Sequence, residues 1–151
     1  MDSELIEKFE KIRNEPLDVE NNRCWEKHIK LKKIFEDLGY ETEYRVCSFL
    51  WSEQRIPKKI IDMIQEDLDY HLYLEVEING LKLVIDASND FLLPEYNIWD
   101  GKSSCNICVV PKEFINENIE EIIQNQLNKK YSSEQINFFK EVNLFFDSLR
   151  K

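Results

Sequence analysis

Cys24 combines a nucleophilic side chain with a position that favours its reactive form. It lies in the first turn of a helix expected over about 23–38, in which apolar residues recur at helical spacing, with Asn21-Asn22 offering an N-cap and Gly39 ending the helix. The unpaired backbone N–H groups and the dipole of a first helical turn favour a thiolate over a neutral thiol. A free cysteine is also a common small buried hydrophobe, so Cys24 alone does not define a catalytic site.

A β-hairpin is expected to supply the residues that would activate this thiol. Its strands, over 70–78 and 81–88, flank Asn79-Gly80, a dipeptide that favours a type I′ turn because both central positions need a positive φ. One face of the hairpin is apolar and is expected to be core, which fixes the register. This face consists of Leu72, Leu74, Val76 and Ile78 on the first strand and Leu81, Leu83, Ile85 and Ala87 on the second.

The other face of the hairpin carries His71, Tyr73 and Asp86. The register makes His71 and Asp86 diagonal neighbours, about 7 to 8 Å apart at their backbones, so their side chains can meet. A carboxylate beside an imidazole holds one tautomer and stabilises the protonated ring, which is the base and orienting half of a nucleophilic triad. Cys24 would complete it. The alternative is a half-exposed surface hydrogen bond that carries no chemistry.

Several short motifs follow one another in an order and spacing similar to a known superfamily. They are Cys24-Trp25 opening a helix, Leu38-Gly39-Tyr40 closing it, the strand Tyr44-Arg45-Val46, the strand from Tyr70 to Val76, and Val84-Ile85-Asp86-Ala87-Ser88. Over about residues 20–95 the sequence resembles the transglutaminase-like core. The resemblance implies a papain-like thiol fold with Cys24 as nucleophile, His71 as base and Asp86 as orienting residue. Departures from the usual pattern are Arg23 before the cysteine, Leu72 after the histidine, and Ala87-Ser88 in place of Pro-Thr.

This triad would perform acyl transfer. His71 would accept the Cys24 proton, the thiolate would attack an amide or ester carbonyl, and the thioacyl group would pass to water in a hydrolase or to an amine in a transferase. An oxyanion hole needs a second donor besides the Cys24 backbone N–H. The candidate donors and cleft residues are Asn22, Trp25, Trp51 and Gln54.

Two other functions stay open. The first is a catalytically inactive member of the same fold that binds a peptide or a protein. The second is an enzyme similar to the arylamine N-acetyltransferases, which share the order of Cys, His and Asp. Those enzymes are much longer and carry a further domain, which disfavours them for this chain.

The composition narrows the class of partner. The 151 residues include 20 Lys and Arg against 30 Asp and Glu, a net charge of −10, which argues against nucleic acid or an anionic membrane as the main partner. We expect a peptide, protein or small amide or ester substrate and no cofactor; the sequence does not indicate the oligomeric state. Without a signal peptide or an apolar run near the roughly 18 residues of a membrane span, we expect a cytoplasmic protein with reduced thiols.

The negative charge of the chain is also expected to influence which substrates the cleft accepts. Acidic residues crowd the strand that carries His71, so we expect a cleft that favours neutral or cationic substrates. These residues are Glu66, Asp67, Asp69, Glu75 and Asp90.

The remaining pattern predicts one α+β domain over 1–151, in which the nucleophile helix and C-terminal helices pack on an antiparallel sheet. The core would span about 20–95, followed by a C-terminal strand and two helices over about 105–150. The other expected elements are a helix over Ser3–Asn14, a strand over 43–51, a short helix or loop from Ile56-Pro57 to about 65, a strand over 105–110, a helix from Pro111 to about 128, and a last helix that begins at the capping box Ser132-Ser133-Glu134-Gln135. The buried stripe of the last helix would be Ile136, Phe139, Val142, Phe145, Phe146 and Leu149.

The other cysteines and the second histidine are expected to be structural. Cys105 and Cys108 have the spacing of metal ligands but lack the second pair that a structural zinc needs, so two thiols on a strand are expected instead. Cys47 is expected in the core or the cleft wall. His28 lies four residues after Cys24, on the same helix face, and is expected to be an exposed polar residue.

Overall fold

The fold is α+β, with a curled sheet of four antiparallel strands. The computed structural model describes residues 3–16, 18, 22–88 and 99–148. Within these residues the strand order is β3-β2-β1-β4, and the strands are β1 (Thr42–Leu50), β2 (Leu68–Ile78), β3 (Leu81–Ile85) and β4 (Pro111–Ile115). The helices are α1 (Ser3–Asn14), α2 (Cys24–Asp37), α3 (Lys58–Ile61), α4 (Ile119–Leu127) and α5 (Ser133–Ser148), with a 3₁₀ turn, η1, at Trp51–Glu53.

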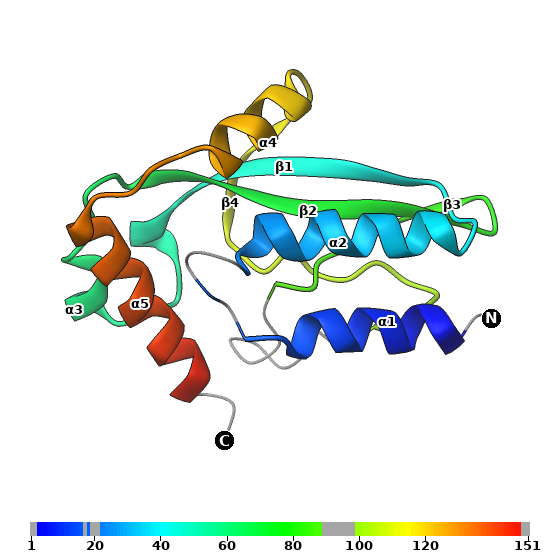
Figure 1. Cartoon of the computed structure of the whole chain (residues 1–151), viewed down its shortest axis with the longest axis horizontal. Coiled ribbons are helices and arrows are strands. Elements are labelled where there is room, and N and C mark those ends of the chain that lie inside the picture. The colour runs from blue at the N-terminus through cyan, green and yellow to red at the C-terminus, as the bar shows by residue number, and fades with distance from the viewer. Residues whose placement is uncertain (1–2, 17, 19–21, 89–98, 149–151) are drawn as a thin grey trace.

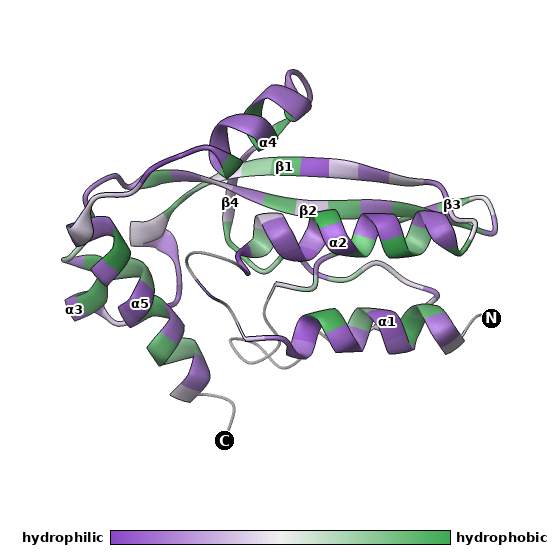
Figure 2. Ribbon diagram, in the orientation of Figure 1, coloured by the Kyte–Doolittle hydropathy of each residue, from purple (hydrophilic) through white to green (hydrophobic). Residues whose placement is uncertain are grey.

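Helix α2 packs against β1 and β2, and α1 lies beside α2 (Figure 1). The α1 residues Leu5, Phe9 and Ile12 recur at helical spacing and are fully buried, which confirms the predicted packing helix. They share one core cluster with Leu31 and Phe35 of α2 and with the apolar residues of β2 and β3. Both helices alternate hydrophobic and hydrophilic positions, as expected of helices covered on one side (Figure 2). This cluster fixes α2, and with it Cys24, relative to the sheet.

The β2–β3 hairpin has the predicted turn and register. Asn79 and Gly80 both adopt positive φ, 53° and 79°, and Ile78 pairs with Leu81. The apolar face is buried from Leu72 to Val76 and from Leu83 to Ala87. Leu81 is 61% exposed, so its assignment to the core is wrong. It directly follows the turn, as the first residue of β3.

The prediction for residues 105–128 is wrong in its boundaries. The strand occupies Pro111–Ile115, where we expected the start of a helix, and the helix runs only over Ile119–Leu127. Pro111 is the first residue of an edge strand, a position where a missing N–H donor is tolerated. Residues 105–110 form irregular backbone instead of a strand, and Cys105 N–H donates to Val84 O at 2.7 Å.

Helix α5 closes one end of the molecule together with α3 (Figure 1). Its capping box forms as predicted, because Ser132 N–H donates to Gln135 Oε1 and Gln135 N–H donates to Ser132 Oγ. Its buried residues are Phe138, Val142 and Phe146, whereas Ile136, Phe139 and Phe145 are half-buried and Leu149 lies outside the described residues. Phe138, Phe139, Val142, Phe145 and Phe146 pack with Ile56, Ile60 and Trp51 in a cluster separate from the main core.

No helix in the described part of the chain is both long enough and apolar enough to span a bilayer.

Candidate active site

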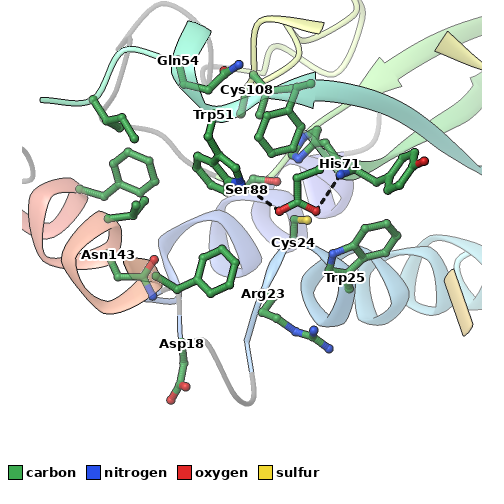
Figure 3. Close-up of a pocket in the computed structure, with 18 of the residues that line it drawn as sticks. Asp18, Arg23, Cys24, Trp25, Trp51, Gln54, His71, Ser88, Cys108 and Asn143 are labelled. Carbon is green, nitrogen blue, oxygen red and sulfur yellow. Dashed lines mark hydrogen bonds between the residues drawn. The ribbon is translucent and has the colours of Figure 1, made fainter. Parts of the chain in front are cut away.

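Cys24 and His71 line one cleft, although 47 residues of the sequence separate them. The cleft encloses about 840 Å³, including its solvent-open mouth, and lies between the start of α2, the end of β1 and α5. Its close-up view shows Cys24 and His71 near its centre, with Trp51 and Ser88 beside them (Figure 3). The folded chain therefore brings the predicted nucleophile and the predicted base into the same solvent-accessible space.

Cys24 is the first residue of α2, as predicted. The N-cap is Arg23, in an extended conformation, rather than Asn21-Asn22; Asn21 lies outside the described residues. The Arg23 backbone N–H donates to Glu26 Oε1 at 2.9 Å, so the side chain of Glu26 fixes the start of the helix. Cys24 is half-buried, and the backbone N–H groups of its helical turn have no intrahelical acceptors, so they can donate to a group bound beside its sulfur.

His71 meets Asp86, as the hairpin register predicts. Its Nε2–H donates to Asp86 Oδ2 at 2.7 Å, and both residues are buried, with 4% and 0% of their surfaces exposed. Burial alone would lower the pKa of His71. The charge and hydrogen bond of Asp86, together with a hydrogen bond and charge interaction from Cys24, outweigh burial and raise this pKa well above its usual value. The structure thus favours an imidazolium at this position, not a half-exposed surface histidine.

The two ring nitrogens of His71 serve different partners. Nε2 is bonded to Asp86, which leaves Nδ1 as the ring nitrogen available to the Cys24 thiol, whose interaction with His71 also raises the pKa of the ring. Cys24, His71 and Asp86 therefore form a continuous relay from a thiol through an imidazole to a carboxylate.

Asp86 is a fully buried acceptor for several donors. Its Oδ2 also accepts the Cys108 backbone N–H at 2.7 Å, and its Oδ1 accepts the Ser88 N–H at 3.0 Å. Burial would raise the pKa of Asp86, but the charge and hydrogen bond of His71 outweigh it and hold this pKa far below its usual range. A carboxylate held in this way can fix the orientation of the imidazole throughout a reaction.

His28 is a site residue that the sequence interpretation placed wrongly. It is fully buried rather than exposed. Its Nδ1–H donates to Cys24 O at 2.8 Å, and its Nε2 accepts the Ala87 N–H at 2.9 Å. A neutral imidazole satisfies both bonds, so His28 links the turn that carries the nucleophile to the backbone beside Asp86. Its position four residues after Cys24 was the available signal.

His28 makes the stability of the protein depend on pH. Burial lowers its pKa to about 4 from 6.5; the charge of Asp86 raises this pKa, whereas those of His71 and Lys27 lower it further. Between these two pH values the unfolded chain binds a proton that the folded chain excludes, so His28 stabilises the folded state above pH 6.5 and progressively less down to pH 4. We expect the free energy of unfolding, measured by urea titration, to fall by roughly 3 kcal/mol more across this range than in His28→Gln. Equal pH slopes for both proteins would refute this.

The side chains expected to donate to an oxyanion, those of Asn22, Trp51 and Gln54, are not free to do so in the structure. The Trp51 indole N–H donates to Asp69 Oδ2 at 3.0 Å, and the Gln54 amide donates to Leu50 O and Val110 O. Both residues line the cleft. Asn22 Nδ2 donates to Pro16 O at 2.7 Å, and Asn22 is not among the residues of the cleft wall. The side-chain donors of Trp51 and Gln54 are therefore engaged within the protein.

Ser88 and Trp25 complete the wall near the thiol. The Ser88 hydroxyl is buried, lines the cleft and has no hydrogen-bond partner among the described residues. The Ser88 hydroxyl could therefore donate to a bound carbonyl. The sequence analysis named Ser88 only as a departure from the family pattern. Trp25 is 4% exposed and packs against Val46 and Leu72, so it acts as a rigid part of the wall.

The other thiols are less suited to nucleophilic attack. Burial raises the pKa of Cys47 to about 11 and that of Cys105 to about 12. Cys47 pairs directly opposite His71 in the sheet, as core. Cys108 is half-buried and lines the cleft, on irregular backbone rather than the predicted strand. Within the described residues no group of three or more His, Cys, Asp and Glu side chains could hold a metal ion.

The acidic residues expected around the cleft are mostly placed elsewhere. Only Asp69 of that set lines it; Glu75 pairs with Arg45, Asp67 accepts bonds from Ser52, Glu66 lies near Lys129, and Asp90 is outside the described residues. Burial raises the pKa of Asp69, against the bonds donated to it by the Tyr70 N–H and the Trp51 indole. Most of the acidic residues on which the expected substrate preference rests therefore do not line the cleft.

Comparisons of the chain with protein-family models, with curated protein sequences and with solved structures find no match in any of the three. The resemblance to transglutaminase-like proteins remains a prediction from the residues themselves.

Proposed function

We propose that this protein is a cysteine-dependent acyl-transfer enzyme with a papain-like arrangement of thiol, imidazole and carboxylate, similar to transglutaminase-like proteins. One observation carries the proposal. Cys24 begins a helix in an open cleft and is hydrogen-bonded to His71, whose opposite ring nitrogen lies 2.7 Å from the buried Asp86 carboxylate. A nucleophile, its base and an orienting group in this order can split an acyl transfer into two steps.

In the first step, the proton of the Cys24 thiol moves to His71, which gives the imidazolium that the site favours, and the thiolate attacks the carbonyl carbon of an amide or ester. The C–S bond forms, the bond to the amine or alcohol breaks, and His71 returns the proton to that leaving group. Asp86 keeps the imidazolium oriented while it carries the proton. The transient oxyanion lies at the start of α2, where the Cys24 backbone N–H can donate to it.

In the second step, water or an amine enters the cleft and gives a proton to His71 as it attacks the thioester. The C–S bond breaks, and His71 returns the proton to the Cys24 thiolate. Water makes the protein a hydrolase and an amine makes it a transferase. Both routes use the same three residues.

A binding module is the second candidate. It is favoured by the side-chain donors of Trp51 and Gln54, which are engaged with Asp69 and with backbone carbonyls. Such a module would bind its ligand with the same affinity after Cys24→Ser and would turn over no ester or amide.

Selective alkylation tests the proposed nucleophile. We expect Cys24 to react with iodoacetamide near pH 7 about tenfold or more faster than Cys108, because the helix start and the His71 imidazolium favour its thiolate. Cys108 is the matched control, since it is also half-buried and lines the same cleft. Peptide mass spectrometry over a time course gives both rates. Equal and slow labelling of the two thiols would contradict the proposal.

Acyl transfer itself is tested with p-nitrophenyl acetate. The peptide that contains Cys24 should gain one acetyl group, and Cys24→Ser should abolish both this adduct and the release of p-nitrophenol above the blank. Release of p-nitrophenol that persists in Cys24→Ser would assign the activity to another group.

A further inference from the structure

The cleft extends from the thiol into an apolar chamber. An aromatic row begins at His71, continues through Phe49 and Trp51, and reaches Phe139 of α5, with ring centroids 6.4, 4.9 and 6.0 Å apart in succession. Phe139, Val142, Asn143 and Phe146 lie on one face of α5 and form the far wall, with Ile56 beside them. Most of the surface that this chamber offers to a ligand is therefore hydrocarbon or aromatic ring.

The charged groups of the wall do not favour an anion in the chamber. Arg23 is held by Glu26 through Nε at 2.9 Å and Nη2 at 2.6 Å, and it also donates to Gln126 O. Asp69 adds a carboxyl group, and burial raises its pKa. An anionic headgroup would thus meet a carboxyl group and a guanidinium that is already paired, whereas a neutral apolar group meets ring faces.

We infer that this chamber binds the acyl part of the substrate and selects a neutral, extended hydrocarbon or aromatic acyl group. The inference rests on the proposed function, which places the reacting carbonyl at Cys24. The acyl group stays bound to the sulfur through both steps, so a pocket that is continuous with Cys24 suits it. The leaving group must depart and be replaced by water or an amine.

A series of p-nitrophenyl esters tests this inference with a constant leaving group. From acetyl to butyryl to hexanoyl, kcat/KM above a Cys24→Ala blank is expected to rise about two- to fourfold for each added methylene, the ratio typical of a buried CH₂. A parallel series of acetate esters with lengthening alkyl alcohols should show no comparable rise. A flat acyl series, or a preference that follows the alcohol, would overturn the assignment.

Variants of α5 locate the selectivity. Val142 is buried in the far wall, so Val142→Phe should lower the ratio of hexanoyl to acetyl kcat/KM by about tenfold or more. Leu144 is 62% exposed and is not part of the wall, so Leu144→Phe is the matched control and should leave this ratio unchanged. An unchanged ratio in a folded Val142→Phe would overturn the inference, and the wild-type series decides it if that variant does not fold.

Binding without turnover separates the two proposals. In Cys24→Ala, the fluorescence of Trp25 and Trp51, which both line the cleft, can report binding of neutral alkyl amides. Hexanamide, which has two more methylenes, should bind about 4- to 16-fold more tightly than butyramide. If no ester is turned over through Cys24 but this ratio is observed, the proposed enzyme function fails and the apolar pocket stands. Equal affinities would refute the pocket, whatever the turnover.

Discussion

His71→Gln is expected to slow the alkylation of Cys24 near pH 7 by about 100-fold, the lower end of the range for a positioned acid or base. The variant removes the ionisable ring that is hydrogen-bonded to Cys24 but keeps an amide that can donate to Asp86. His71→Ala should have a similar kinetic effect and also leave the buried Asp86 carboxylate without this donor. Comparison of the two variants separates the effect of losing the ionisable ring from the effect of losing the hydrogen-bond donor to Asp86.

The pH profile of this reaction sharpens the test. Asp86 raises the pKa of His71, so the wild-type protein keeps its imidazolium above pH 6.5. In His71→Gln the alkylation rate should instead rise with pH like that of an ordinary thiol. Rates measured from pH 5 to 9 by loss of free Cys24 give both curves. Superimposable profiles would remove His71 from the mechanism.

Asp86→Ala is expected to lower the free energy of unfolding by about 3–5 kcal/mol, the usual result of removing one partner of a buried ion pair. The substitution leaves the His71 imidazolium without its counterion and deprives the backbone N–H groups of Ser88 and Cys108 of their acceptor. Urea unfolding at pH 6.5 measures the effect. Asp62→Ala removes an exposed carboxylate and should change stability by less than about 0.5 kcal/mol.

The His71–Asp86 pair contributes to the free energy of unfolding only within a definite pH range. The pKa of Asp86 is lowered on folding, so its contribution is present above about pH 4 and is lost as the pH falls further. The pKa of His71 is raised, so its contribution is fully present below pH 6.5 and is lost as the pH rises through the raised pKa. The penalty of Asp86→Ala should therefore be greatest between about pH 4 and 6.5. A penalty that does not change from pH 5 to 10 would contradict the assigned charges.

The sequence predicts the parts of the site that local rules determine. The Asn79-Gly80 turn fixes the hairpin register, and strand alternation then places His71 and Asp86 on the same face. Helical spacing and the closing Gly39 place Cys24 in a first turn. None of these inferences needs a contact between elements distant in the sequence, which is why they hold in the folded chain.

The features that sequence reasoning missed depend on distant contacts. His28 is a polar residue between Lys27 and Ile29, and only the packing of α2 on the backbone beside Asp86 makes it a buried link. Residues 105–110 have strand-like composition but run past Asp86, where the Cys108 N–H finds its acceptor. The side-chain amide of Gln54 bonds to Val110, 56 residues away. No local pattern encodes such partners.

The irregular segment that supports Asp86 also protects the sheet from aggregation. At the β3 edge, Val84 has both backbone groups occupied, because its N–H donates to Ser104 Oγ and its carbonyl accepts the Cys105 N–H. The opposite edge, β4, begins with a proline followed by exposed Lys112 and Glu113. Open strand edges recruit further strands, and covering, proline and charge each prevent this. The segment from Ser104 to Cys108 therefore has two roles. Its Cys108 N–H holds the Asp86 carboxylate, and its Ser104 and Cys105 cover the edge of β3 against pairing with another strand.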